Sequence, residues 1–139
     1  MSAYGEALKI LSRRRRSAHE LKLKLEEKGL SSGDISEAIK KCIDRGFLND
    51  AEYIADFINA QKNKGIGPYV IRMKLKMKFH LSDEEIPPIQ ASLDIALKKP
   101  KYQRLLTTRE GKQKLIASLL RKGFKLDEIR ASFFIRGDL

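Results

Sequence analysis

Apolar residues recur along the chain at the spacing expected of short amphipathic helices. Three pairs of aliphatic residues can be aligned with one another, and in each the two residues are four positions apart and are followed four positions later by glycine or phenylalanine. The pairs are Leu21/Leu25, Ile71/Leu75 and Leu115/Leu119. Because positions i and i+4 lie on one face of an α-helix, each pair marks the buried side of a helix. The repeat distance of about 44 to 50 residues is close to the length of a three-helix unit.

Start and stop signals divide the chain further. Ser17 with Glu20 forms a capping box, in which the serine oxygen accepts the amide hydrogen near Glu20. Further start signals are Ser31, Asn49, Gly67–Pro68, Thr107 and Asp127, and the stop signals are Gly29, Gly46, Gly65 and Gly123. The sequence therefore predicts an all-α fold, an elongated tandem array of three three-helix repeats with about nine short helices. The predicted repeats are residues 1–48, 49–99 and 100–139.

Residues 73–81 are compatible with two kinds of element. Apolar residues alternate strictly with Lys74, Lys76, Lys78 and His80, as they would in a half-buried strand. We favour a helix, because the segment consists mainly of Leu, Met and Lys, which are good helix formers without β-branching. On a helix, these basic residues would fan around the exposed side.

Two prolines shape the next element. Pro87 and Pro88 would clash inside a helix that began at Ser82, so the predicted sixth helix begins near Pro87 or Pro88 and stops at Pro100. Residues that the periodicity turns toward the core include Ile43, Leu120, Phe133 and Phe134. Cys42 lies on the same face as Ile43, and no histidine accompanies it in the pattern. We therefore interpret Cys42 as a small core residue rather than a nucleophile.

Composition narrows the class of protein. The chain has 139 residues, of which 34% are charged and 42% hydrophobic, a balance typical of a globular protein rather than a disordered one. No apolar run is long enough for a membrane span, and the charged N-terminal pattern does not resemble a secretory signal. One cysteine and two histidines offer no recognisable metal-ligand spacing. We expect a cytoplasmic protein without a metal or other cofactor.

The sequence does not indicate an enzyme. The acidic groups Asp50/Glu52/Asp56 and Asp83/Glu84/Glu85 fall where helices begin, where acidic residues are expected for capping and dipole reasons. The glycines of KGIGP lack the Lys-Ser/Thr ending of a phosphate loop and are interpreted as a helix stop and start. A catalytic triad is a spatial arrangement that a sequence can hide, but no candidate set stands out.

The basic residues are the remaining functional signal. The net charge of +11 favours a polyanionic or strongly acidic partner, although a solvated basic surface would give the same composition. The candidate binding residues are Arg13, Arg14, Arg15, Arg16, Lys22, Lys24, Arg72, Lys74, Lys76, Lys78, Arg121 and Lys122. In stacked repeats they could form a basic strip that follows a phosphate backbone. Without tryptophan, and with most other aromatic residues on predicted core faces, the stacking platform of a typical single-strand binder is missing.

Four segments carry a further signal: ALKILSRRRRSAHELKLKL, RGFLNDAEYIADF, GIGPYVIRMKL and LIASLLRKGFKLDEI. In their order and spacing, these segments together resemble the RecX regulatory protein family. The resemblance implies a helical-repeat modulator, rather than an enzyme, that binds the RecA recombinase filament on single-stranded DNA. Such proteins restrain the filament's ATPase, strand-exchange and coprotease activities in DNA repair, homologous recombination and the SOS response. We expect a monomer. The alternative is a sequence-independent DNA-binding protein acting through a basic helical surface.

The middle repeat departs from the family pattern. Phe79 and His80 stand where a glycine and an aliphatic residue are usual, one extra residue precedes Ile86, and Pro87 and Pro88 are uncommon. These changes affect the expected packing of the fifth and sixth helices.

Overall fold

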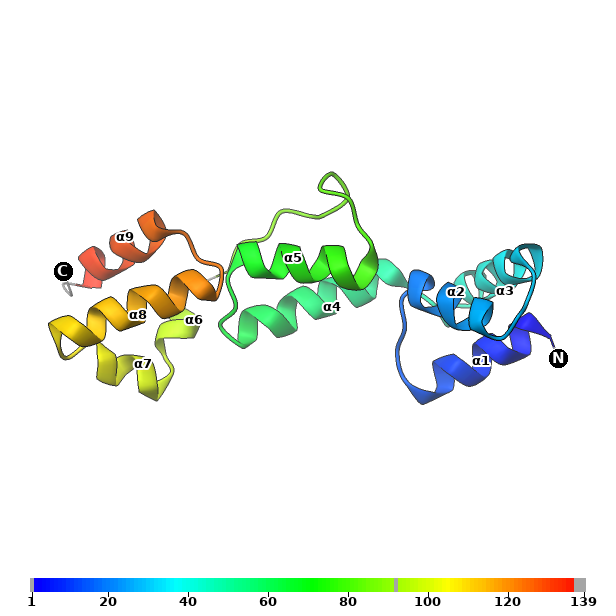
Figure 1. Ribbon diagram of the computed structural model, residues 1–139, viewed down its shortest axis with the longest axis horizontal. Coiled ribbons are helices and arrows are strands. Elements are labelled where there is room, and N and C mark those ends of the chain that lie inside the picture. The colour runs from blue at the N-terminus through cyan, green and yellow to red at the C-terminus, as the bar shows by residue number, and fades with distance from the viewer. Residues whose placement is uncertain (1, 92, 137–139) are drawn as a thin grey trace. The chain divides into compact units, whose positions relative to one another are not determined.

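The computed structural model describes the backbone of residues 2–91 and 93–136 and the side chains as far as residue 133. Within these residues the fold is all-α, as predicted, with nine helices and no strand (Figure 1). The helices are α1 (Ala3–Arg13), α2 (Ala18–Glu27), α3 (Ser32–Asp44), α4 (Asp50–Asn63), α5 (Pro68–Phe79), α6 (Leu93–Leu97), α7 (Pro100–Leu105), α8 (Arg109–Arg121) and α9 (Leu126–Arg136). They form two compact units, Met1–Ala55 and Asp56–Leu139, which we call unit 1 and unit 2.

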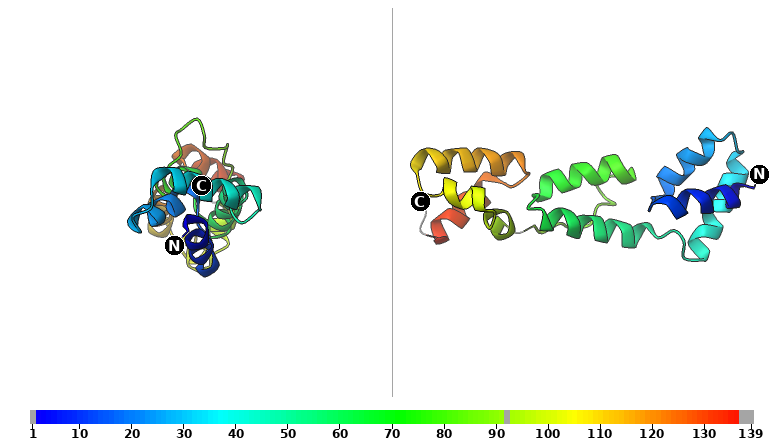
Figure 2. Two further views of the ribbon diagram at one scale, coloured as in Figure 1. Left: turned by 90° about the vertical axis from the view of Figure 1, so that its right-hand side faces the viewer. Right: turned by 90° about the horizontal axis from the view of Figure 1, so that it is seen from below.

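Unit 1 is built from α1, α2 and α3, which pack against one another (Figures 1 and 2). Its core consists of Ala7, Ile10, Leu21, Leu25, Ile35, Cys42 and Leu48. Leu21 and Leu25 are fully buried, as their spacing predicts. Cys42 is also fully buried, and this burial raises the pKa of its thiol. The interpretation of Cys42 as a core residue is confirmed.

Two side chains cap the start of α2. The Ser17 hydroxyl accepts the Glu20 amide at 3.1 Å, as the capping box predicts. The carboxylate of Asp50, at the start of α4, accepts the amide of Ala18 at 2.9 Å. These bonds satisfy two of the backbone donors that a helix N-terminus leaves unpaired. At the other end of α2, Gly29 has φ of +78° and ends the helix as predicted.

Because Ser17 is fully buried, Ser17→Ala should destabilise unit 1 by about 1 to 2 kcal/mol, at the upper end of the range for lost N-caps. The substitution removes the cap and leaves the Glu20 amide without its acceptor. Ser31→Ala is a matched control, since the exposed Ser31 caps α3 in the same way at 3.2 Å. It should cost about 0.5 to 1 kcal/mol because water can replace the lost acceptor. Urea unfolding monitored by circular dichroism measures the free energy of unfolding of both variants. Equal losses of stability would contradict the role of burial.

Unit 2 contains the larger part of α4 and all of α5 to α9. The α4 and α5 helices run side by side (Figures 1 and 2), and the rings of Phe57 and Phe79 meet edge to face with centroids 5.8 Å apart. The core among α6 to α9 consists of Ala96, Leu97, Tyr102, Leu115, Leu119, Phe124, Ile129 and Phe133. The Tyr102 hydroxyl lies 3.0 Å from that of Ser118, so its polar end is satisfied.

A glycine contact joins the α4–α5 turn to the α8–α9 turn. The amide of Gly67 donates to the carbonyl of Lys122 at 2.6 Å, and that of Tyr69 donates to the carbonyl of Gly123 at 3.1 Å. A Cβ atom on Gly67 would lie only 2.4 Å from the carbonyl carbon of Gly123. Gly123 itself has φ of +98°, a conformation that favours glycine. The two turns therefore meet backbone to backbone.

The ambiguous segment is helical, as we favoured. Ile71, Leu75 and Phe79 are buried along α5. The helix extends through Phe79, and His80 takes the left-handed conformation at φ of 57°. In the alignment of the three repeats, Phe79 stands in the place of Gly29 and Gly123, and it is a buried aromatic residue. The left-handed residue here is His80, one position later.

The prediction for the sixth helix was wrong about its start. Residues 86–91 are not helical, and α6 begins only at Leu93. Pro87 disfavours a helical conformation at the residue before it, and Pro88 extends this restriction to Pro87 itself. Ser82 and Glu85 do form the hydrogen bonds of a capping box, but they close a turn instead of starting a helix.

Two smaller predictions also need correction, one about a helix cap and one about two core residues. The α8 helix is capped by Thr108, whose hydroxyl accepts the Gly111 amide at 2.9 Å, rather than by Thr107. The hydroxyl of Thr107 instead donates to the carbonyl of Arg104. Ile43 and Leu120, predicted to face the core, are exposed because they lie at the edges of their apolar stripes. The side chain of Phe134 lies outside the described residues.

Candidate functional site

The four consecutive arginines at the end of α1 and in the link after it do not form one basic patch. Arg13 is the last residue of α1, and the backbone of Arg14 is extended, so consecutive side chains leave in different directions. The Arg14 guanidinium lies 3.8 Å from the Glu20 carboxylate. That of Arg15 stacks 4.6 Å above the ring of Tyr53. Arg13 and Arg16 instead line a shared pocket.

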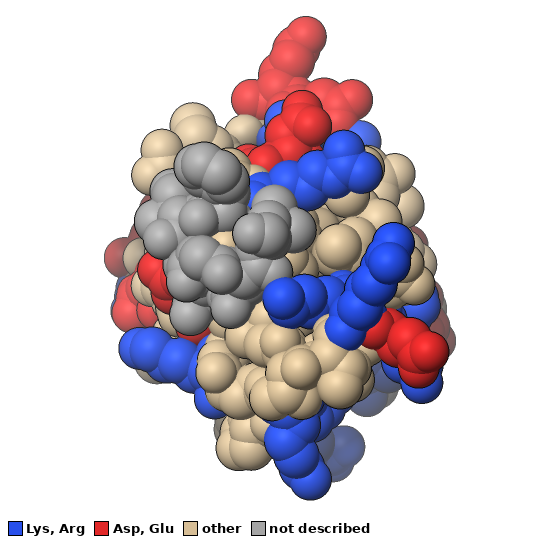
Figure 3. Space-filling model, turned by 90° about the vertical axis from the view of Figure 1, so that its left-hand side faces the viewer, with Lys and Arg blue, Asp and Glu red and all other residues tan. Residues whose placement is uncertain are grey.

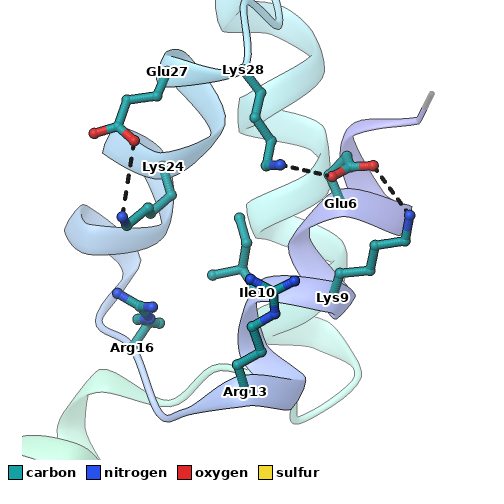
Figure 4. Close-up of a pocket in the computed structure, with 8 residues that line it drawn as sticks. All are labelled: Glu6, Lys9, Ile10, Arg13, Arg16, Lys24, Glu27 and Lys28. Atoms are coloured by element: carbon teal, nitrogen blue, oxygen red, sulfur yellow. Dashed lines mark ion pairs between the residues drawn. The ribbon is translucent and has the colours of Figure 1, made fainter.

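This pocket lies between α1 and α2 and has a volume of about 350 Å³ (Figure 4). We call it the α1–α2 pocket, and it is lined by Glu6, Lys9, Ile10, Arg13, Arg16, Lys24, Glu27 and Lys28. Lys22 is exposed elsewhere on α2 and does not line it. Sequence reasoning grouped Lys22 with Lys24, whereas the turn of the helix separates them.

The acidic residues of the pocket are already paired with lysines. Glu6 lies 3.2 Å from Lys28 and 3.5 Å from Lys9, and the hydrogen bond from Lys28 is the main cause that lowers the pKa of Glu6. Glu27 lies 3.9 Å from Lys24. With five cationic side chains and two carboxylates, the lining keeps a net positive charge.

The basic residues of α5 occupy both flanks of the helix. Arg72 and Lys76 lie on one flank, and both pair with Asp83, whose pKa is lowered chiefly by its hydrogen bond with Lys76. On the other flank, Lys74 donates to the side-chain carbonyl of Gln61 at 2.8 Å. Lys78 lies over the ring of Phe57. As expected for a helix, these residues fan out rather than form a line.

Between these flanks lies a row of apolar side chains that the sequence analysis missed. Tyr69, Met73 and Met77 are 67%, 44% and 80% exposed, and we call them the α5 stripe. They are spaced by four residues, and so are the buried residues Ile71 and Leu75. Each residue of the stripe is two positions away in the sequence from a buried residue. Two positions correspond to about 200° around a helix, which places the stripe opposite the core. The alternation that resembled a strand therefore reflects two apolar faces on one helix.

The remaining predicted residues lie near the glycine contact. Arg121 is exposed at the end of α8, and Lys122 is half-buried with its carbonyl bonded to Gly67. Figure 3 views the end of unit 2 that carries α8 and α9, and shows lysine and arginine side chains spread around it among acidic ones. The predicted basic residues of unit 2 thus lie at separate places on α5 and α8.

Residues 2–91 and 93–136 contain no group of three histidine, cysteine or acidic residues arranged to hold a metal ion. Among the helices of these residues, none is long and apolar enough to cross a membrane.

Comparison with known proteins identifies the family. A model of the first three-helix domain of RecX matches residues 3–42, and a model of the third matches residues 91–132. The regulatory protein RecX of Vibrio vulnificus is 30% identical over an alignment that covers 94% of this chain and 90% of that protein. The chain belongs to the RecX family.

The share of the relative's length that aligns with this chain differs among RecX proteins. RecX of Legionella pneumophila is 38% identical over 76 residues, 55% of this chain and 51% of that protein. RecX of Bacillus licheniformis is 31% identical across 93% of this chain but 53% of that protein. The matched region therefore spans about half the length of these two relatives. The crystal structure of RecX from Lactobacillus salivarius has a TM-score of 0.66 at 27% identity, covering 93% of this chain and 90% of that one.

Proposed function

We propose that this chain binds the RecA recombinase filament on single-stranded DNA and lowers its ATPase, strand-exchange and coprotease activities. The observation that carries the proposal is membership of a family of regulatory proteins, with 30% identity to a RecX protein across nearly its full length. The chain would act as a cytoplasmic monomer. The division into repeats 1–48, 49–99 and 100–139 stays a prediction.

Two kinds of surface support a target made of both protein and nucleic acid. The basic residues of α1, α2, α5 and α8 suit phosphate or acidic protein groups. The α5 stripe suits a protein surface, because exposed methionines and a tyrosine in a row are typical of protein contacts. A filament offers DNA phosphates and protein side chains together, whereas DNA alone leaves the stripe without an apolar partner.

The test is the DNA-dependent ATPase rate of RecA filaments as the protein is titrated in at near-physiological salt. We expect inhibition well below one protein per RecA subunit. Adding more single-stranded DNA should not relieve the inhibition, because the target is the assembled filament rather than free DNA. Unchanged ATPase at an excess of the protein would contradict the proposal.

The alternative function is sequence-independent DNA binding, which the positive α1–α2 pocket favours. A salt titration with naked single-stranded DNA separates the two. Tight binding whose log affinity falls with log salt by about 0.7 per phosphate contacted would favour the alternative. Weak binding to naked DNA with strong binding to the filament would favour the RecA regulator.

A further inference from the structure

The α1–α2 pocket gathers cationic groups from three consecutive parts of unit 1. Arg13 comes from the end of α1, Arg16 from the link, and Lys24 from the last turn of α2 (Figure 4). Arg13 lies beside Ile10, which is buried and forms an apolar part of the wall (Figure 4). Charges next to an apolar wall are less screened than charges surrounded by water, so an anion here would be held more firmly than on an open surface.

The lysines of the pocket are paired with its glutamates, so the two arginines are the cationic groups that an incoming anion would meet unpaired. Lys9 and Lys28 both pair with Glu6, and Lys24 lies at a longer distance from Glu27. Among the described residues, Arg13 and Arg16 form no ion pair. These two lysines balance the carboxylate of Glu6, and the hydrogen bond from Lys28 lowers its pKa. The uncompensated positive charge is therefore on the arginine side of the pocket.

Arg16 also has a polar atom that lacks a partner. Its Nε is buried, and no hydrogen-bond acceptor for it lies among the described residues. A buried donor without an acceptor costs about 1 to 3 kcal/mol, so such a group usually indicates a missing water, ion or ligand. Guanidinium groups bind phosphate oxygens through parallel hydrogen bonds, which Arg13 and Arg16 can offer to an oxyanion in the pocket that they both line.

The lining also bears on which part of a nucleotide would enter. No aromatic side chain lines the pocket, so a base would find nothing on which to stack. The basic side chains suit a phosphate, whose charge is the same in every nucleotide. We propose that the α1–α2 pocket binds a phosphodiester group of a single-stranded polynucleotide through Arg13, Arg16 and Lys24. This proposal deepens the proposed function. It rests on that function for one point, namely that the polynucleotide is single-stranded DNA.

Lys24 and Lys22 provide a matched test. They lie two residues apart on α2, carry the same charge and are both exposed, but only Lys24 lines the pocket. Binding of labelled oligo(dT) is measured by fluorescence anisotropy at several salt concentrations. Lys24→Ala, and Arg13→Ala with Arg16→Ala, should weaken binding several-fold at low salt and reduce the salt slope by about 0.7, the contribution of one phosphate. Lys22→Ala should change affinity less than twofold and keep the slope.

Equal losses for Lys22→Ala and Lys24→Ala would overturn the proposal, because a diffuse basic surface predicts equal effects. Unchanged slopes in the pocket variants would also overturn it. Unchanged circular dichroism melting curves identify variants that keep their fold. The RecA ATPase assay on the unaltered protein is independent of this result. Inhibition of RecA without a pocket effect removes only the pocket proposal, and a pocket effect without inhibition removes only the RecA proposal.

A direct measurement follows the Nε–H signal of Arg16 by nuclear magnetic resonance. Oligo(dT) should shift this signal, and Arg13→Ala should reduce the shift. Pyrophosphate serves as the probe for free phosphate. A shift with pyrophosphate but none with oligo(dT) would assign the pocket to small phosphates and overturn the polynucleotide part. No shift with either probe would overturn the whole proposal.

Discussion

Gly67→Ala should destabilise unit 2 by about 3 kcal/mol, the sum expected from an overpacked contact and two lost backbone hydrogen bonds. The new Cβ would lie 2.4 Å from the carbonyl carbon of Gly123 and 2.6 Å from the amide nitrogen of Phe124. Backbone atoms cannot rotate away as a side chain can, so the two turns would have to separate. That separation would break the bonds from Gly67 to Lys122 and from Tyr69 to Gly123.

Gly33→Ala is the control for this prediction. Gly33 lies in the first turn of α3, and a Cβ there would meet no atom within 4 Å. Alanine at such a site should leave stability unchanged or raise it by up to about 1 kcal/mol, since it narrows the unfolded ensemble. Urea unfolding monitored by circular dichroism compares the two variants. A Gly67→Ala protein as stable as the parent would show that the turns do not meet as described.

Met73→Glu with Met77→Glu should raise the concentration needed for half-inhibition of the RecA ATPase at least tenfold. Burying a methionine at an interface contributes about 1.5 to 3 kcal/mol, so losing two such contacts exceeds the 1.4 kcal/mol of a tenfold effect. Both side chains are exposed, and the melting temperature should therefore change little. This prediction rests on the proposed RecA target.

Two further variants separate apolar contact from charge. Met73→Ser with Met77→Ser removes the apolar groups without adding negative charge, and it should also weaken inhibition. Ile43→Glu places one carboxylate on an exposed apolar residue of α3, outside the α5 stripe, and should leave inhibition near its parental value. Normal inhibition by the serine variant would contradict a role for the stripe. Loss of affinity for naked DNA in that variant would assign the stripe to DNA instead.

Local signals in the sequence were sufficient for most helix ends. Ser17, Ser31 and Asn49 were predicted as helix starts, and each accepts the amide three residues further on, because a cap depends only on residues that close in the sequence. The error at α6 arose where Pro87 and Pro88 adjoin a turn whose hydrogen bonds imitate a helix start. A capping pattern shows that a chain can begin a helix, and the residues after it decide whether the helix continues.

The candidate site was less accessible to sequence reasoning. The residue types were evident, but Arg13 and Arg16 share a pocket while Arg14 and Arg15 have other partners, a difference that depends on backbone direction after α1. The α5 stripe had a signal in its four-residue spacing. That signal was hidden because two apolar faces on one helix produce the same alternation as a strand.

The glycine contact has a consequence for how unit 2 opens. Amide hydrogens exchange with solvent when their hydrogen bonds break, and those of Gly67 and Tyr69 are bonded across two turns that are more than fifty residues apart in the sequence. These two amides therefore exchange only when the helical hairpins separate. A partner that bound only the α8–α9 turn and held it in place would slow this opening, and the added protection would appear at the amides of Gly67 and Tyr69 without any contact there.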